Sequence, residues 1–258
     1  MPAVRPMRHA RPRQQRIAVG RALEAVLCMG VIFTFAYFFV GYAQGSNDFI
    51  VRQVAIYGLS YLDEQTVLQQ SGVSSDGNVF SVNESEIARR VEELPFVEHC
   101  EVRRVYPDTI ALHIGGRVSA AVLHAGLHAY ESDRSGVVLR EYGPSDMPVD
   151  PFITEVSGTE FIAVGEHLSN PALHSALAVW DAFRVSSLYG RLTVSELVAV
   201  RSDDVRMYCD EVPYEIRWGR DDYGELARRL EAMWARFDGQ LPCYEYVDLR
   251  FGEDVACK

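Results

Sequence analysis

The chain has 258 residues, of which 48% are hydrophobic and 24% charged, a composition that excludes disordered, collagen-like and disulfide-scaffold proteins. The net charge of -11 is unevenly distributed, because six arginines and no acidic residue precede Glu24. The 25 Lys and Arg less these six leave 19 basic against 36 acidic groups, a balance of -17. A basic N-terminal tail therefore precedes an acidic remainder. Its arginines are Arg5, Arg8, Arg11, Arg13, Arg16 and Arg21.

An apolar run separates these two parts of the chain. No formal charge occurs between Glu24 and Asp48, and Leu23 to Tyr42 is rich in large apolar and aromatic residues. At about 1.5 Å per helical residue, such a run crosses a hydrocarbon core of about 30 Å. We therefore expect a cytoplasmic basic tail over 1–22 and a transmembrane helix over 23–43. Arginines before the helix place the remaining chain outside the cytoplasm.

A cleavable signal peptide is the alternative interpretation of this run. Gly41-Tyr42-Ala43 forms a weak small-x-small cleavage site. The apolar run exceeds the usual length of about 7–15 residues and is rich in bulky aromatics, including Tyr37 and Tyr42 at interfacial positions. The pattern favours an uncleaved anchor, with cleavage left open.

The segment after the membrane predicts the order β-α-α-β-β. Asp63 and Gly72 are placed to begin and end a short helix. Asn83 and Pro95 bracket a second helix, whose apolar residues recur at helical spacing. The predicted elements are a strand over 49–58, helices over 62–72 and 83–95, and strands over 97–105 and 109–114.

Short strand candidates dominate beyond residue 117, interrupted by two helical patterns. The strand candidates are 120–122, 137–139, 152–156, 192–200, 205–208 and 214–218, and the helices begin near Pro171 and before Leu226. In the last run, Val247, Leu249 and Phe251 alternate with Asp248 and Arg250, the pattern of a half-buried strand. We expect this run at the chain's end to be an edge strand.

This order of segments resembles the FtsQ/DivIB family of bacterial division proteins, whose membrane-proximal unit is a POTRA domain. The matching segments are 49–58, 78–82, 94–97, 102–110 and Tyr246-Val247-Asp248-Leu249-Arg250-Phe251. The resemblance implies an α+β fold: a transmembrane helix, a POTRA domain over 49–117 and a mixed antiparallel β-sheet domain with two helices over 118–258. Gly116 to Ala120 departs from the family's usual acidic residue, arginine and proline.

The resemblance implies a non-enzymatic divisome scaffold in the inner membrane, enriched at the division septum. Its C-terminal edge strand would recruit the FtsB/FtsL pair through backbone pairing. The implied partner-binding positions are Tyr246, Val247, Leu249, Arg250, Phe251 and Gly252, although burial in the domain's own core is an equal alternative for Val247 and Leu249. A second surface on the POTRA unit, at Ile56, Tyr57 and Gly58, would meet FtsK/FtsW-type partners.

No motif predicts a cofactor, a metal site or a catalytic group. The chain lacks GxSxG, HExxH, a Walker lysine loop and GxGxxG. His124 and His128 lie in strand-like surroundings, which argues against zinc, and we interpret Asp203-Asp204 and Asp221-Asp222 as solvated loop tips. The N-terminal arginines are better explained by topology and anionic lipid than by nucleic acid. A small-molecule substrate is not expected.

Two other classes of protein remain as alternatives. A membrane-tethered periplasmic enzyme would need a concave pocket with convergent polar groups in the region 117–258. Another POTRA protein of envelope assembly or secretion would need further POTRA units or barrel strands.

The cysteines leave several pairings open. Cys28 lies in the apolar run, while Cys100, Cys209, Cys243 and Cys257 would face an oxidising compartment and permit three full pairings. A Cys243–Cys257 bond would staple the terminal strand, and free thiols are an equal alternative. The family resemblance implies that Cys100 is buried and unpaired.

Overall fold

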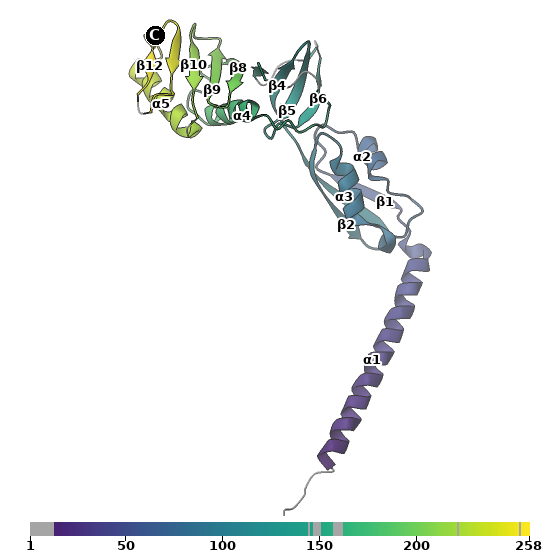
Figure 1. The fold of residues 1–258 in the computed structure, drawn as a ribbon. Coiled ribbons are helices and arrows are strands. Elements are labelled where there is room, and N and C mark those ends of the chain that lie inside the picture. Colours follow the sequence, from purple (N-terminus) through teal and green to yellow (C-terminus); the bar gives the residue numbers. More distant parts are fainter. Residues whose placement is uncertain (1–12, 144, 147–150, 157–161, 221, 253) are drawn as a thin grey trace, which may run out of the picture. The chain divides into compact units, whose positions relative to one another are not determined.

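We analysed a computed structural model, which describes residues 13–143, 145–146, 151–156, 162–220, 222–252 and 254–258 (Figure 1). Its first element is a long helix, α1 (Arg13–Gly45). Within α1, the 20 residues Glu24–Ala43 are apolar and long enough to cross a membrane, and none of the most apolar stretch is buried in the protein. The apolar window coincides with the predicted helix over 23–43, whereas α1 itself begins ten residues earlier, at Arg13.

The chain forms two compact units. The smaller unit contains α1 and the residues after it to Ala55, together with Val73–Glu84 and Arg103–Ala111. The larger unit contains Ile56–Gly72, Ser85–Val102 and Leu112–Lys258. The predicted domain boundaries, 49–117 and 118–258, stay a prediction.

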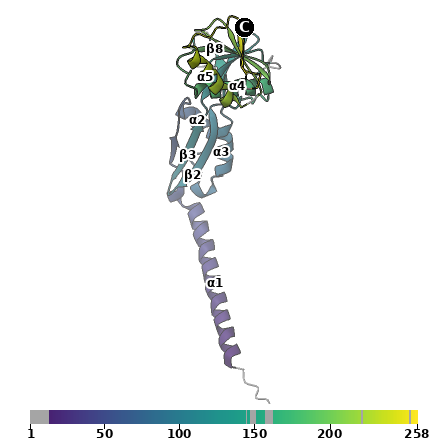
Figure 2. The ribbon, with the colours of Figure 1, turned by 90° about the vertical axis from the view of Figure 1, so that its left-hand side faces the viewer.

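The elements after α1 follow the predicted β-α-α-β-β order. They are η1 (Asn47–Phe49), β1 (Gln53–Tyr57), α2 (Glu64–Ser71), η2 (Val79–Ser81), α3 (Glu84–Glu92), β2 (Val97–Val105) and β3 (Thr109–Gly116). The strands form a sheet in the order β1-β3-β2, with α2 and α3 beside it (Figure 2). Asp63 accepts hydrogen bonds from two backbone amides at the start of α2, and Gly72 ends that helix with φ 63°.

The first strand begins later than predicted. Val51 donates its N–H to the Gly77 carbonyl at 2.8 Å, and Arg52 donates to the Asp108 carbonyl at 2.9 Å. Because these backbone groups bind loop segments, the strand ladder starts only at Gln53. Residues 49–52 are therefore a connector that is held against other loops.

A nine-stranded mixed sheet follows. Its strands are β4 (Ser119–Ala125), β5 (His128–Asp133), β6 (Val138–Tyr142), β7 (Phe152–Thr154), β8 (Val194–Arg201), β9 (Asp204–Cys209), β10 (Glu215–Trp218), β11 (Tyr246–Asp248) and β12 (Ala256–Cys257). They lie in the order β12-β11-β10-β9-β8-β7-β4-β5-β6. The pairs β10–β11, β4–β7 and β7–β8 are parallel.

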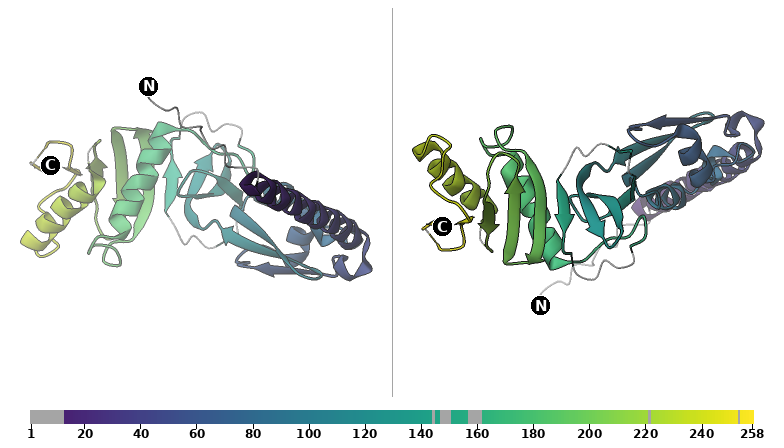
Figure 3. Two further views of the ribbon diagram at one scale, coloured as in Figure 1. Left: turned by 90° about the horizontal axis from the view of Figure 1, so that it is seen from below. Right: turned by 90° about the horizontal axis from the view of Figure 1, so that it is seen from above.

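Two helices, α4 (Pro171–Arg184) and α5 (Tyr223–Arg236), cover one face of this sheet (Figure 3). Asn170 and Asp222 cap them by accepting backbone N–H groups, and Pro171 begins α4 as predicted. Helix α4 packs on β8 and β9 and beside α5. Fully buried Phe183, Leu197 and Trp218 belong to the resulting core.

The α+β fold is confirmed, and the sequence pattern missed two strands. β5 reads HAYESD and buries Ser132 and Asp133, so it lacks an apolar alternation. It is a strand because it pairs with β4 on one side and β6 on the other. β12 has two residues, too few for any periodic signal.

Candidate partner-binding edge at the C-terminus

The C-terminal end of the large sheet differs from the prediction of an edge strand over 246–251. β11 covers Tyr246–Asp248 alone, and it pairs in parallel with β10 and antiparallel with β12. The outermost strand described is therefore β12 rather than β11. The prediction that the 246–251 run forms the edge was wrong, because residues much closer to the C-terminus fold back and pair with it.

The predicted alternation holds, and it divides the proposed partner-binding residues into two groups. Val247 and Leu249 are both fully buried in the core of the domain. For both residues, burial in the domain's own core is therefore the correct alternative to partner binding. Neither side chain is available to a partner. Tyr246, Asp248 and Arg250 alternate with them and face the side that α4 and α5 leave open.

Exposed aromatic rings flank this strand. The side chain of Phe251 is 58% exposed, and Gly252 follows it in the left-handed region with φ 54°. Tyr244, which the sequence reasoning did not select, is 84% exposed. Tyr246 is half-buried and carries the Arg217 guanidinium 4.1 Å from its ring centroid.

A network of ion pairs covers the helix-free face next to this edge. Arg250 binds the Asp248 carboxylate through Nε at 2.9 Å and Nη2 at 2.6 Å, and its Nη1 lies 3.4 Å from Asp204. Asp204 is 5% exposed, so the interpretation of Asp203-Asp204 as a solvated tip was wrong for this residue. Asp203 is exposed and pairs with Arg201.

Electrostatics keep two carboxylates of this network, those of Asp248 and Glu215, ionised. Burial acts to raise the pKa of the Asp248 carboxyl. Hydrogen bonds from Arg250, together with the charges of Arg250 and Arg217, outweigh burial and hold that pKa below its ordinary value. The pKa of Glu215 is lowered in the same way, against burial, by hydrogen bonds from Tyr208 and Arg217. The face therefore presents charges that are already paired.

A disulfide between Cys243 and Cys257, with Cα atoms 5.4 Å apart, joins β12 to the segment before β11. The Lys258 carbonyl accepts the Tyr246 N–H at 3.3 Å, and the Lys258 N–H donates to the Tyr246 carbonyl at 3.1 Å. Because backbone groups alternate along an antiparallel strand, those of Cys257 point away from β11. One residue of β12 therefore directs its N–H and C=O outward.

The POTRA residues that the sequence selected lie at the end of β1. Tyr57 is 53% exposed, and its ring stacks on His113 with centroids 4.9 Å apart. Gly58 has φ 84°, and a Cβ at this position would lie 2.1 Å from the Ile114 carbonyl oxygen. Gly58 therefore permits a close backbone approach, while Ile56 is half-buried.

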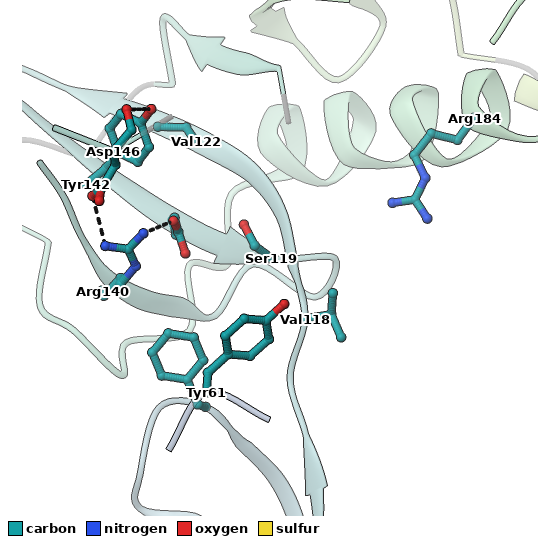
Figure 4. Close-up of a pocket in the computed structure, with 10 residues that line it drawn as sticks. Tyr61, Val118, Ser119, Val122, Arg140, Tyr142, Asp146 and Arg184 are labelled. Carbon is teal, nitrogen blue, oxygen red and sulfur yellow. Dashed lines mark hydrogen bonds and ion pairs between the residues drawn. The ribbon is translucent and has the colours of Figure 1, made fainter. Parts of the chain in front are cut away.

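A cavity of about 580 Å³ lies in the larger unit (Figure 4). The rings of Tyr61 and Phe96, 5.7 Å apart, line one side of it. Arg140 pairs there with Glu131 and with Asp146, the latter at 2.8 Å. Its described lining includes one serine and no histidine or cysteine. The carboxylates that converge on the cavity are thus bound to an arginine rather than free to act as bases.

The remaining candidates for chemistry contact neighbouring side chains or are buried. His124 lies in β4 and contacts the Phe152 ring, while His128 pairs with Glu141. No group of three potential metal ligands occurs in the described part of the chain. Burial raises the pKa of the Cys100 thiol to about 11 and that of Cys209 to about 12, which keeps both protonated. Cys100 is buried and free, as predicted.

Comparison with known proteins gives matches over nearly the whole chain. Residues 49–115 match the family described as "POTRA domain, FtsQ-type". A cell division protein FtsQ from Syntrophotalea carbinolica is 22% identical over 95% of this chain and 86% of its own length. FtsQ from Geotalea daltonii is 25% identical over 94% of this chain and 86% of its own length. FtsQ from an Anaeromyxobacter species is 27% identical over 89% and 77%.

An apolar N-terminal helix, a POTRA domain and a mixed sheet define a single-pass membrane protein of bacterial cell division. Within that class, residues 49–115 match the FtsQ-type POTRA family, and nearly the whole chain is similar to FtsQ cell division proteins.

Proposed function

We propose that this protein is a non-enzymatic scaffold that joins the cytoplasmic, membrane and periplasmic parts of the divisome. Its basic tail lies in the cytoplasm, α1 spans the inner membrane, and residues 49–117 and 118–258 form two periplasmic domains at the septum. It recruits an FtsB/FtsL-type pair through the C-terminal edge of the large sheet. The observation that carries the proposal is the short outermost strand β12, which pairs with β11, together with the exposed ring of Phe251 three residues beyond the end of β11.

The capture mechanism is strand addition. A partner's extended segment pairs with the outward backbone groups of Cys257 and continues the sheet. Phe251 supplies the exposed apolar anchor, and Gly252 lets the chain turn beside it. Arg250 is already paired with Asp248 and Asp204, which hold its guanidinium in one position. In that position it orients an acidic group of the partner.

The buried residues of the same run act from within the domain. Val247 and Leu249 pack in the core and hold β11 against β10, and Tyr246 is fixed beneath the Arg217 guanidinium. These contacts give the edge a defined position before a partner arrives, which reduces the ordering entropy of binding.

A second surface on the POTRA unit, around Ile56, Tyr57 and Gly58, meets FtsK/FtsW-type division proteins. The exposed Tyr57 ring at the end of β1, an outer strand of the three-stranded sheet, supports this surface. A sheet edge offers the same backbone pairing that serves at the C-terminus.

Depletion of the protein tests its role in division. Cells lacking it are expected to grow as filaments, and a fluorescent fusion to the full chain is expected to gather at midcell. Normal division together with an even distribution of the fusion along the membrane would contradict the proposal.

Replacement of Phe251 tests the docking site itself. The Phe251→Glu variant is expected to weaken capture of the FtsB/FtsL pair at least about tenfold, or about 1.4 kcal/mol, because an exposed apolar anchor becomes a charge. Leu127→Glu is the matched control, since Leu127 is 100% exposed at the turn between β4 and β5. Equal capture by both variants in a pull-down with purified proteins would remove the C-terminal site and leave the family assignment intact.

A further inference from the structure

The end of the membrane helix is bound to a distant part of the chain. The last carbonyls of a helix have no partner within that helix. The Ala43 carbonyl accepts the Asn78 Nδ2 amide at 2.9 Å, and Asn78 Oδ1 accepts the Phe80 N–H, also at 2.9 Å. Ala43 is 3% exposed, whereas the apolar side chains before it in α1 lie open. One asparagine thus ties the end of α1 to η2.

The connector after α1 strengthens this tie. Val51 is 2% exposed and donates its N–H to the Gly77 carbonyl at 2.8 Å. Arg52 donates its N–H to the Asp108 carbonyl in the turn between β2 and β3 at 2.9 Å. The end of α1, the η2 segment and this turn all belong to the smaller compact unit, so their relative positions are set within it.

A row of aromatic rings lies on the same segments. The Phe49 and Phe80 rings have centroids 5.0 Å apart, and those of Phe80 and Tyr106 are 5.1 Å apart. Tyr106 is 54% exposed and its neighbour Val105 is 49% exposed. We call Phe49, Phe80, Val105 and Tyr106 the aromatic foot. Its Val105 and Tyr106 side chains are exposed, whereas Phe49 and Phe80 are half-buried. It carries one phenolic hydroxyl, and its member Phe80 donates its backbone N–H to Asn78.

The position of Ala43 sets the depth of the aromatic foot. The apolar window ends at Ala43, and its 20 residues match a hydrocarbon core of about 30 Å. Asn78 is within hydrogen-bond distance of that end. With α1 across a bilayer, this end lies at the level where headgroups replace hydrocarbon. Tyrosine and other amphipathic rings favour this layer, because it accepts an apolar body and a polar tip together.

We propose that the aromatic foot rests in the headgroup layer of the bilayer that α1 crosses. The aromatic foot contacts the lipid headgroups. This contact fixes the distance of the first residues outside the membrane from the bilayer and their angle to it. The inference depends on α1 spanning the membrane and is independent of partner capture at the C-terminus.

Tryptophan quenching in nanodiscs containing the full chain tests this contact. Tyr106→Trp places an indole at the aromatic foot, Phe35→Trp places one near the middle of the apolar window, and Tyr244→Trp places one at a site 84% exposed. Emission is compared with the wild type, which has three tryptophans. Lipids brominated near the headgroup are expected to quench the added Tyr106→Trp signal at least twofold more than lipids brominated deep in the chains. Phe35→Trp is expected to show the reverse order.

The outcomes separate the inference from its premise. If Phe35→Trp is quenched but Tyr106→Trp is quenched no more than Tyr244→Trp, the lipid contact alone is overturned. Absence of quenching at Phe35→Trp would show that α1 is outside the bilayer and would overturn the inference together with its premise. Val105→Trp repeats the measurement at a second exposed position if the Tyr106 variant does not fold.

Asn78→Asp tests the tie itself. This variant keeps the Oδ1 acceptor for the Phe80 N–H and loses the Nδ2 donor to Ala43. In the Tyr106→Trp background it is expected to halve the headgroup-level quenching or reduce it further. Unchanged quenching would overturn the part that Asn78 plays in holding the foot at the membrane.

Discussion

Asp248 lies on the helix-free face of the large sheet, with 1% of its surface exposed and its carboxylate shared between Arg250 and Arg217. Taking a carboxylate out of water is unfavourable unless charged hydrogen bonds replace the lost hydration. Two bonds from the Arg250 guanidinium and one from its backbone N–H do so here. The same arginine reaches Asp204 on β9, so a single side chain links β11 to β9 across the intervening strand β10.

The Asp248→Asn variant is expected to lower the free energy of unfolding by about 1–3 kcal/mol at pH 7, because an arginine that is 30% exposed loses its charged partner. The pKa of Asp248 is lowered in the fold from an ordinary value of 3.8. Its contribution to stability is thus present above about pH 4 and is lost as the pH falls through the lower folded value. Denaturation with urea from pH 7 to pH 2 measures this.

The difference between wild type and Asp248→Asn should therefore shrink as the medium becomes acidic. Asp203→Asn is a suitable control, since Asp203 belongs to a pair whose side chains are 67% and 51% exposed. A gap between wild type and Asp248→Asn that stays constant to pH 2 would contradict the assigned electrostatic role.

At the scale of elements, β12 depends on the disulfide that holds it. Two residues form too few backbone bonds to stay paired by themselves, and loop closure over a separation of 14 residues is entropically unfavourable. The Cys243–Cys257 bond imposes that closure covalently. In the chain-entropy description, a disulfide that closes a loop of this size stabilises the folded state by about 3 kcal/mol. The covalent link thus decides which strand is outermost.

The Cys243→Ser/Cys257→Ser double variant is expected to release β12 and expose the backbone of β11. The Tyr246 amide, which donates to Lys258, should exchange with deuterium at least tenfold faster. Hydrogen exchange with mass spectrometry of the C-terminal peptide measures this change. A reductant should accelerate exchange in the wild type and leave the double variant unaffected; slow exchange in the double variant would show that pairing alone holds β12.

At the scale of the whole molecule, α1 is the one described helix that is long and apolar enough to cross a membrane. Its apolar window is open on all sides, unlike a helix of a protein core, and it carries bulky aromatics along its length. The basic tail before it and the acidic chain after it are separated by this one element. Composition therefore predicts that α1 attaches the chain to a membrane.

Retention of α1 is expected in the mature protein. The membrane fraction should contain the chain at its full mass of 29.0 kDa, resistant to extraction by high salt and released by detergent. Immunoblotting and intact-mass analysis of fractionated cells check this. A soluble form that begins after residue 43 would identify the run as a cleaved signal peptide.

Local patterns in the sequence predicted the elements well where the determining residues are neighbours. The apolar run defines α1, Asp63 and Gly72 bound α2, and Pro171 begins α4, because helix ends depend on contacts within a few residues. The alternation of Val247 and Leu249 likewise predicted which face of β11 is buried.

The sequence by itself therefore determined the long apolar helix, the resemblance to FtsQ proteins, and the order and faces of most elements. The tertiary structure decided that β12 is outermost, that Cys243 pairs with Cys257, and that Asp204 is buried beneath Arg250. These outcomes join residues that are distant in the chain, so they depend on strand pairing and on the positions of side chains from other elements. No periodicity or local motif encodes those relations.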